Sequence, residues 1–177
     1  ARVDAPGGEA FIEYLLSQAA TVALDRNDLV PVPAGARTAV ILLATRYQIQ
    51  AECSRYADPT LTRWVGVGDN PSGDEIGWAV EAANASDVVI VWTQDAIRNP
   101  EQQALVNALP QEKTVAVALW SPYDWQTYPN VAGYALAYSP LRPSVPPVCA
   151  ALFGAAPAPG QLAVTLGPGL VAGSRDE

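Results

Sequence analysis

The segment from residue 87 to residue 124 has the clearest pattern of apolar and polar positions in the chain. Two apolar runs, Val88–Trp92 and Val115–Trp120, flank an amphipathic stretch whose apolar positions recur at helical spacing. A strand, a crossover helix and a second apolar strand form a βαβ unit, whose two strands are parallel and covered on both faces. Polar residues follow each run, Thr93-Gln94-Asp95 after the first and Ser121-Pro122-Tyr123-Asp124 after the second. Ligands of open α/β sheets bind at the carboxyl ends of strands, so these residues are the first candidates for a site.

The same criteria predict helices and strands along most of the chain. Helices are predicted at Ala10–Asp25, at Gln48–Tyr56, at Glu75–Asn84 and from Ser144 to a capping Gly154. Further strands are predicted at Thr38–Ala44, Leu61–Val67, Tyr134–Tyr138 and Gln161–Leu166. Their alternation predicts an α/β fold: a three-layer α/β/α sandwich with a mostly parallel, flavodoxin-like sheet and Thr38–Ala44 as a central strand.

We expect residues 1–166 to form a single domain that begins with a helix and an extended segment over residues 1–36. With 177 residues, the chain is long enough for one such domain with a proper core. Residues 167–177 are polar or Gly- and Pro-rich and lack a core-forming pattern, so a flexible tail is predicted there. The chain contains no Met and opens with Ala1, which favours a piece of a longer protein.

Charge and composition exclude several classes of function. The net charge is −8 and only ten residues are Lys or Arg, so the clustered positive charge that nucleic acids and anionic membranes require is missing. No apolar run reaches the roughly 18 residues of a membrane span. The chain has no His, which rules out Ser-His-Asp catalysis and His-ligated metals within it. Gly-rich phosphate-binding motifs are also missing, so neither a cofactor nor a metal is expected.

Four residues at the predicted strand ends are candidates for contact with a ligand: Asp95, Arg98, Asp124 and Arg46. Asp95 and Asp124 follow strands that are expected to be neighbours, so they are the best pair of carboxyl groups in the chain. The two arginines have the forked donors that bind hydroxyl and carboxylate groups. Each position also has an ordinary structural explanation. Asp95 can begin a turn and Asp124 can cap a helical segment, whereas Arg98 can be a solvated surface residue and Arg46 can form an ion pair. We predict substrate-binding residues here and no catalytic residue.

Aromatic residues gather around the same strand ends, namely Trp92, Trp120, Tyr123 and Trp125. Sugars stack on aromatic faces, so these side chains are candidates for a binding rim. Packing in the core or between domains is the alternative explanation.

The two cysteines, Cys53 and Cys149, fit neither a CxxC redox motif nor a zinc motif. Cys53 belongs to the helix after the first apolar strand and Cys149 to the last helix. In a doubly wound sheet these two helices often lie on the same face, which favours a disulfide between them. Two free buried thiols are the alternative. A disulfide would indicate an oxidising compartment.

Several segments resemble one family in the same order along the chain. They are Asn27–Val32 after the first helix, Trp92–Ala96 with Pro100 and Gln102, Val117–Asp124 followed by Tyr128–Val131, and Leu152–Gly154 followed by Pro159–Val164. Together they resemble the C-terminal α/β sandwich domain of glycoside hydrolase family 3, in its bacterial β-N-acetylhexosaminidase-like branch. The resemblance covers residues 8–166.

The resemblance implies a two-domain enzyme in which a TIM-type barrel carries the nucleophilic Asp, and in this branch also an Asp–His acid/base pair. In the glucosidase-like branch, a Glu from a long loop of the sandwich domain is the acid/base instead. The matching loop here, Asp95–Pro100, is short and has no Glu before Glu101, which is expected in the first turn of a helix. This departure favours the hexosaminidase-like branch.

The expected function is therefore that of an accessory domain that docks on a catalytic barrel, contacts a β-linked amino sugar or related glycan, and is not catalytic by itself. A free-standing carbohydrate-binding or scaffold module is the alternative, and a flavodoxin-like small-molecule binder is a third reading that the missing phosphate loop disfavours. An extracellular or cell-envelope location is expected, with a cytoplasmic one left open.

Overall fold

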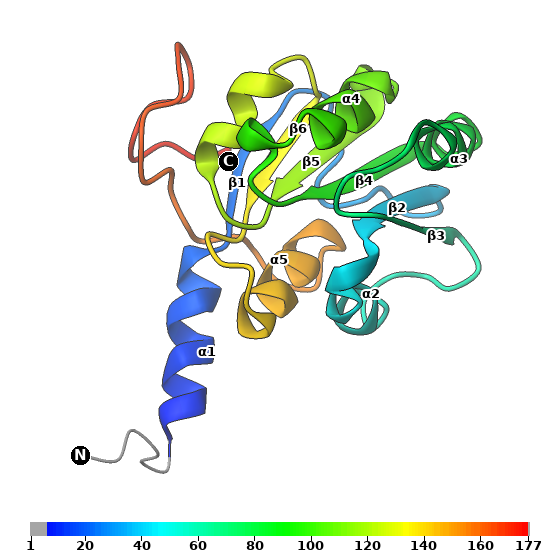
Figure 1. Ribbon diagram of the computed structural model, residues 1–177. Helices are drawn as coiled ribbons and strands as arrows, with labels where there is room; N and C mark the ends of the chain where they lie inside the picture. Colours follow the sequence, from blue (N-terminus) through cyan, green and yellow to red (C-terminus); the bar gives the residue numbers. More distant parts are fainter. Residues whose placement is uncertain (1–6, 177) are drawn as a thin grey trace.

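The computed structural model describes residues 7–176, apart from the side chain of Glu9 (Figure 1). Residues 1–6 of the predicted N-terminal segment and residue 177 of the predicted tail lie outside this range. A six-stranded sheet has the strand order β1-β6-β5-β4-β2-β3. Its strands are β1 (Thr21–Asp25), β2 (Thr38–Leu43), β3 (Thr62–Val67), β4 (Val88–Thr93), β5 (Thr114–Ala118) and β6 (Gly133–Leu136). β1 is antiparallel to β6 and the other pairs are parallel, which confirms the predicted mostly parallel sheet.

Helices cover both faces of this sheet. The α-helices are α1 (Gly8–Ala19), α2 (Gln48–Cys53), α3 (Gly73–Asn84), α4 (Pro100–Ala108) and α5 (Val145–Leu152). α3 and α4 pack on one face, and α2 and α5 on the other, while α1 contacts α5 and projects away from the sheet (Figure 1). The predicted three-layer α/β/α sandwich is therefore confirmed.

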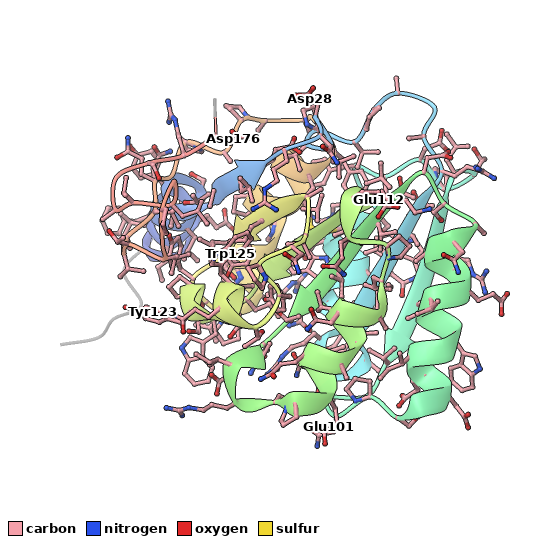
Figure 2. The ribbon with its side chains drawn as sticks, turned by 90° about the horizontal axis from the view of Figure 1, so that it is seen from above. Asp28, Glu101, Glu112, Tyr123, Trp125 and Asp176 are labelled. Carbon is pink, nitrogen blue, oxygen red and sulfur yellow. A yellow bond between two sulfur atoms is a disulfide. The ribbon has the colours of Figure 1, made fainter. Side chains whose placement is uncertain are left out.

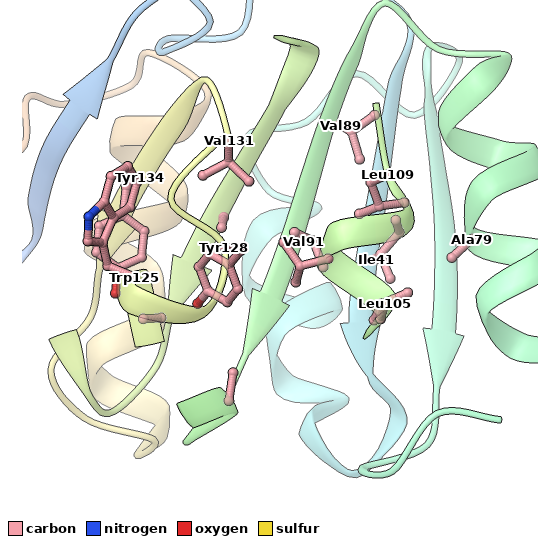
Figure 3. Packing of buried hydrophobic residues seen from close by; sticks show 14 of the residues in the cluster. Ile41, Ala79, Val89, Val91, Leu105, Leu109, Trp125, Tyr128, Val131 and Tyr134 are labelled. Carbon is pink, nitrogen blue, oxygen red and sulfur yellow. The ribbon is translucent and has the colours of Figure 1, made fainter. Parts of the chain in front are cut away.

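The core explains why the central strands are continuous apolar runs. All residues of β4 are buried. Val89 and Val91 pack with Leu105 of α4 on one face (Figure 3), whereas Ile90 and Trp92 pack on the face covered by α2 and α5. Because both faces are covered, the strand does not alternate between apolar and polar residues. β4 and β5 hold the two central positions; β2 is interior but lies one strand from the edge, so its predicted central place is only approximate.

The helix predicted over Ala10–Asp25 is wrong in its second part. α1 ends at Ala19, and Thr21–Asp25 forms β1. The β-branched Thr21 and Val22 favour a strand, and pairing with β6 satisfies the backbone of this segment. The spacing of apolar residues did not distinguish a helix from a strand at Thr21–Asp25. The strand β6, which decides between them, lies more than 100 residues further along the chain.

The last predicted strand, Gln161–Leu166, does not form. Leu162 is instead buried against the core. Its N–H donates to the Ser174 carbonyl at 2.8 Å, and its carbonyl accepts a hydrogen bond from the Gly173 N–H at 2.8 Å, which closes the segment into a loop. The Asp176 N–H donates to the Val22 carbonyl on β1, so the end of the chain lies along the outer strand of the sheet. The alternating pattern therefore reflects burial of Leu162 beneath a loop and not a sheet partner.

The flexible tail predicted over residues 167–177 stays a prediction.

Cys53 of α2 and Cys149 of α5 form a disulfide, and their Cα atoms lie 4.9 Å apart. Both residues are fully buried. The two helices share one face of the sheet, which is the arrangement that the winding of the sheet predicts. The bridge therefore ties the helix after β2 to the last helix of the fold.

Candidate functional site

The order of the strands creates a crevice between β2 and β4. From β2 the chain continues to β3 on one side, and from β4 it continues to β5 on the other side. The connecting helices α2 and α4 lie on opposite faces of the sheet. The segments that follow β2 and β4 therefore diverge at the carboxyl ends of the strands, where open α/β sheets bind their ligands.

A cavity of about 230 Å³ lies at this point. Its lining residues come from the ends of β2, β3 and β4, from the segments that follow them and from α4: Leu43, Arg46, Asp69, Gln94, Asp95, Arg98, Asn99 and Gln102. We call this cavity the strand-end crevice. It brings together Arg46, Asp95 and Arg98, three of the four residues that the sequence analysis selected.

A chain of hydrogen bonds fixes the walls of the strand-end crevice. Arg46 Nε donates to Gln94 Oε1 at 2.6 Å, and the Gln94 N–H donates to Gln102 Oε1 at 2.9 Å. Gln102 Nε2 in turn donates to the Asp69 carbonyl at 2.9 Å. Since Gln102 is buried, these bonds connect the ends of all three strands through a side chain that water does not reach.

The loop between β4 and α4 is held by its own backbone and by a helix cap. Asp95 has a φ of 53°, in the left-handed region that Asp tolerates better than most residues. Asn99 caps α4, because its side chain accepts a hydrogen bond from the Gln102 N–H at 2.9 Å. Glu101 lies in the first turn of α4, as predicted, and points into solvent (Figure 2).

Asp124 is not among the residues that line the strand-end crevice. It belongs to η4 (Pro122–Thr127) and is fully buried. Asp124 Oδ1 accepts a hydrogen bond from the Ile97 N–H at 3.1 Å, and Oδ2 accepts one from the Thr93 hydroxyl at 3.4 Å. Burial raises the pKa of this carboxyl, against the opposing effect of the backbone N–H donors. Asp124 therefore positions the loop after β4, and in this structure it cannot flank a substrate together with Asp95.

The predicted aromatic cluster divides into buried and exposed members. Trp92 and Trp125 are buried, and Trp125 packs 5.3 Å from the Tyr134 ring (Figure 3). Trp120 and Tyr123 are 55% and 42% exposed, and Tyr123 points outward (Figure 2). Core packing thus accounts for the first pair, while the second pair is available at the surface.

Trp120, Tyr123 and Ile97 are exposed apolar residues that we together call the strand-end rim. Trp120 and Tyr123 follow β5, and Ile97 follows β4. The rim therefore lies at the same edge of the sheet as the strand-end crevice.

Sequence reasoning did not select four polar residues of the strand-end crevice: Asp69, Gln94, Asn99 and Gln102. Asp69 follows β3, and its carboxylate accepts a hydrogen bond from the Thr45 hydroxyl at 2.5 Å. Asn99 Nδ2 donates to the Asp69 carbonyl at 3.0 Å. The signal for Asp69 was present, since Gly68-Asp69-Asn70 is a polar segment directly after a predicted strand. The position of β3 next to β2 is what no local pattern indicated.

Comparison with solved structures finds the same fold within glycoside hydrolases. No protein-family model matches the sequence, and no curated protein matches it either. Among solved structures, a family 3 β-N-acetylglucosaminidase from Paenibacillus sp. str. FPU-7 has a TM-score of 0.75 at 17% identity, covering 92% of this chain and 33% of that one. A β-glucosidase of the same family from Bifidobacterium adolescentis has a TM-score of 0.65 at 17% identity, covering 94% of this chain and 30% of that one.

A third structure, a fungal multi-domain family 3 β-N-acetylglucosaminidase, has a TM-score of 0.68 at 22% identity and covers 84% of this chain and 18% of that one. At these identities the similarity shows a shared fold. The chain spans about a third or less of the length of these three enzymes. This partial coverage is what the resemblance to a C-terminal sandwich domain requires.

Two further properties apply to the part of the chain that the structure describes. Within residues 7–176, no helix is long and apolar enough to cross a membrane. In the same range, no group of three or more His, Cys, Asp or Glu side chains is placed to hold a metal ion.

Proposed function

We propose that this chain is a non-catalytic accessory domain of a family 3 glycoside hydrolase and that it docks on a catalytic barrel. The observation that carries the proposal is the coverage: 92% of this chain matches only 33% of a family 3 enzyme. A domain that occupies a third of a larger enzyme has the remainder of that enzyme as its natural partner. Activity therefore depends on residues outside this domain.

The loop after β4 favours the β-N-acetylhexosaminidase-like branch of the family. Gln94–Asn99 connects β4 to α4 and contains no Glu, and Glu101 on α4 is not among the residues that line the crevice. The glucosidase-like resemblance would require an acid/base Glu from this loop. In the hexosaminidase-like arrangement the barrel supplies both catalytic groups, which is compatible with a short loop that hydrogen bonds hold in place.

The strand-end rim is the surface that we propose for docking. Three large apolar side chains are exposed at one edge of the sheet, and such a group favours a contact surface more than a single exposed apolar residue does. α1 carries a second group of exposed apolar side chains, Phe11, Ile12, Tyr14 and Leu15. We assign the barrel to the rim because Ile97 of the rim directly precedes Arg98 of the strand-end crevice, so that docking there brings the crevice to the flank of the barrel.

In this position, Arg46, Asp95 and Arg98 would contact an outer sugar of a β-linked amino sugar or related glycan. Carboxylate oxygens accept hydrogen bonds from sugar hydroxyls, and guanidinium groups donate to them. The hydrogen bond from Arg46 to Gln94 orients the first of these side chains before a ligand arrives. Pre-organised polar groups reduce the entropy that binding loses.

The first test is an assay of the chain alone with nitrophenyl glycosides, including the β-N-acetylglucosaminide. We expect no turnover above buffer. Turnover that survives re-purification and disappears in an Asp95→Asn variant would overturn the non-catalytic assignment.

The second test concerns docking. The chain is produced joined to the polypeptide encoded upstream of Ala1 and also as two separate pieces. Trp120→Ser and Tyr123→Ser should weaken association of the separate pieces, whereas Trp78→Ser, which removes a similarly exposed Trp from α3, should not. Equal effects of the Trp120 and Trp78 variants would exclude the rim as the docking surface, and an upstream sequence that encodes no barrel would contradict the accessory role.

A free-standing carbohydrate-binding module is the second candidate, which the hydrogen-bonded strand-end crevice favours. A glycan array separates the two proposals. Strong binding of a glycan by the isolated chain, abolished by Arg98→Gln, would support the module, because an accessory domain alone presents only part of a site.

We also propose an extracellular or cell-envelope location. The disulfide between Cys53 and Cys149 supports it, since such bonds persist in oxidising compartments. Thiol titration of the denatured, unreduced protein purified from its natural source should find no free thiol; two free thiols would remove this support.

A further inference from the structure

A second cavity, of about 430 Å³, lies between α1, α2 and the start of α5. Its lining residues are Ile12, Glu13, Glu52, Arg55, Arg142, Pro143 and Pro146. We call it the α1–α5 groove. Glu52 of its lining belongs to α2 and Pro146 to α5, the two helices that cover the face of the sheet opposite to α4. Figure 1 shows these helices on that face. Its volume falls in the range of small-molecule sites, roughly 300–1,000 Å³.

The floor of the α1–α5 groove holds a buried carboxylate between two arginines. Glu52 is 2% exposed, and its Oε1 accepts hydrogen bonds from Arg142 Nε at 2.8 Å and Nη2 at 2.7 Å. Oε2 lies 2.9 Å from Arg55 Nη1, although among the described residues no donor is aligned with it for a hydrogen bond. A carboxylate removed from water is stable only with such partners, so Glu52 anchors both guanidinium groups.

The two arginines have more donors than Glu52 uses. A guanidinium has five N–H donors, of which Arg142 directs two at Glu52. The side chains of Arg55 and Arg142 are 61% and 69% exposed, so their remaining donors are accessible. The lining carries two arginines and two acids, Glu13 and Glu52, so it has no net positive charge. An acidic group is therefore recognised by the accessible guanidinium donors and not by an overall charge.

The walls of the α1–α5 groove add apolar surface and one further acidic residue. Ile12, Pro143 and Pro146 supply apolar surface beside the arginines. Glu13 stands on the α1 side and repels an anion placed next to it, so an acidic group is directed to the arginines instead. A ligand that fits has one acidic group and a compact body.

We propose that the α1–α5 groove binds a small organic anion of monosaccharide size, with its carboxylate or phosphate group on Arg55 and Arg142 and its body against Ile12, Pro143 and Pro146. This site is separate from the strand-end crevice and does not depend on the proposed docking on a barrel.

The test is calorimetric titration of the 177-residue chain with glucuronate, glucose 6-phosphate and glucose. Glucose is the control for both acids, because it has a similar body and no acidic group. We expect binding of at least one acid, weakened by added salt, and none of glucose. Binding of glucuronate alone identifies a carboxylate site and binding of glucose 6-phosphate alone a phosphate site, and either result supports the proposal.

Substitutions locate the binding. Arg55→Gln should weaken the affinity about tenfold, the usual effect of losing a hydrogen bond to a charged group. Arg63→Gln is the matched control, because Arg63 is an exposed arginine on β3, outside the groove. Arg142→Gln should act like Arg55→Gln, and if loss of its bonds to Glu52 prevents folding, Arg55→Gln decides alone.

Three results would overturn the proposal. One is the absence of binding by both acids. Another is equal binding of glucose and glucuronate, which would show that the acidic group is not recognised. The third is an equal loss of affinity in Arg55→Gln and Arg63→Gln, which would show that only overall charge matters.

Discussion

Substitution of Asp124 by Asn and by Ala tests whether this buried carboxylate holds the loop after β4. Asp124 accepts hydrogen bonds from the Ile97 N–H and the Thr93 hydroxyl. Asn keeps an acceptor for Ile97 and nearly the same volume. Ala leaves the Ile97 N–H without its partner and creates a small cavity, while Thr93 keeps its contact with the Tyr128 hydroxyl at 2.9 Å. We expect Asp124→Ala to lower the free energy of unfolding by roughly 2–4 kcal/mol and Asp124→Asn by clearly less.

The pH dependence of the Asn variant has a definite sign. Burial raises the pKa of Asp124 in the folded protein, above a value of about 3.9 in the unfolded chain. The folded state therefore binds the proton more tightly, and the stability that this proton contributes is present below the unfolded pKa and lost as the pH rises through the folded pKa. Because the Asn side chain does not titrate, Asp124→Asn should gain stability relative to the unsubstituted protein as the pH rises from about 4.

Urea unfolding followed by Trp fluorescence, at several pH values from about 4 to 7, measures both effects. The other carboxyl groups are common to both proteins, so the difference in free energy of unfolding isolates Asp124. A difference that moves in the opposite direction would mean that the pKa of Asp124 is lowered, and it would refute the assignment of a desolvated carboxylate. Equal stability of the Ala and Asn variants would refute its role in holding the loop.

Three further predictions concern other parts of the fold. Replacing Cys53 and Cys149 together by Ala should lower the free energy of unfolding by about 2–5 kcal/mol, measured by urea unfolding; no change would mean that the bridge does not constrain the unfolded chain. Arg37 holds the pKa of Asp87 at about 2, chiefly through side-chain hydrogen bonds, so Arg37→Gln should raise that pKa in a carbon NMR titration, and an unchanged value would exclude the ion pair. Gly154 has a φ of 74°, so Gly154→Ala should lower the melting temperature, in keeping with a loss of about 1 kcal/mol; an unchanged value would contradict the left-handed cap.

The candidate site was only partly predictable. Arg46, Asp95 and Arg98 were selected because they follow apolar segments, and the parallel sheet brings them to one crevice. Asp124 met the same criterion but is fully buried. The position of a residue after a strand indicates the edge of the sheet at which it lies. It does not indicate whether a neighbouring loop covers the side chain.

The sequence by itself determined the central layer of this protein. The apolar runs of β4 and β5, separated by an amphipathic helix, allow few structures other than a buried parallel pair, because such runs need cover on both faces. Tertiary structure decided the elements whose local pattern fits two states. Thr21–Asp25 became a strand because Thr21 pairs with Leu136 of β6, and residues 161–166 became a loop because Leu162 found its place in the core without a strand partner. In both cases the deciding contacts join residues far apart in the chain, and no local pattern contains them.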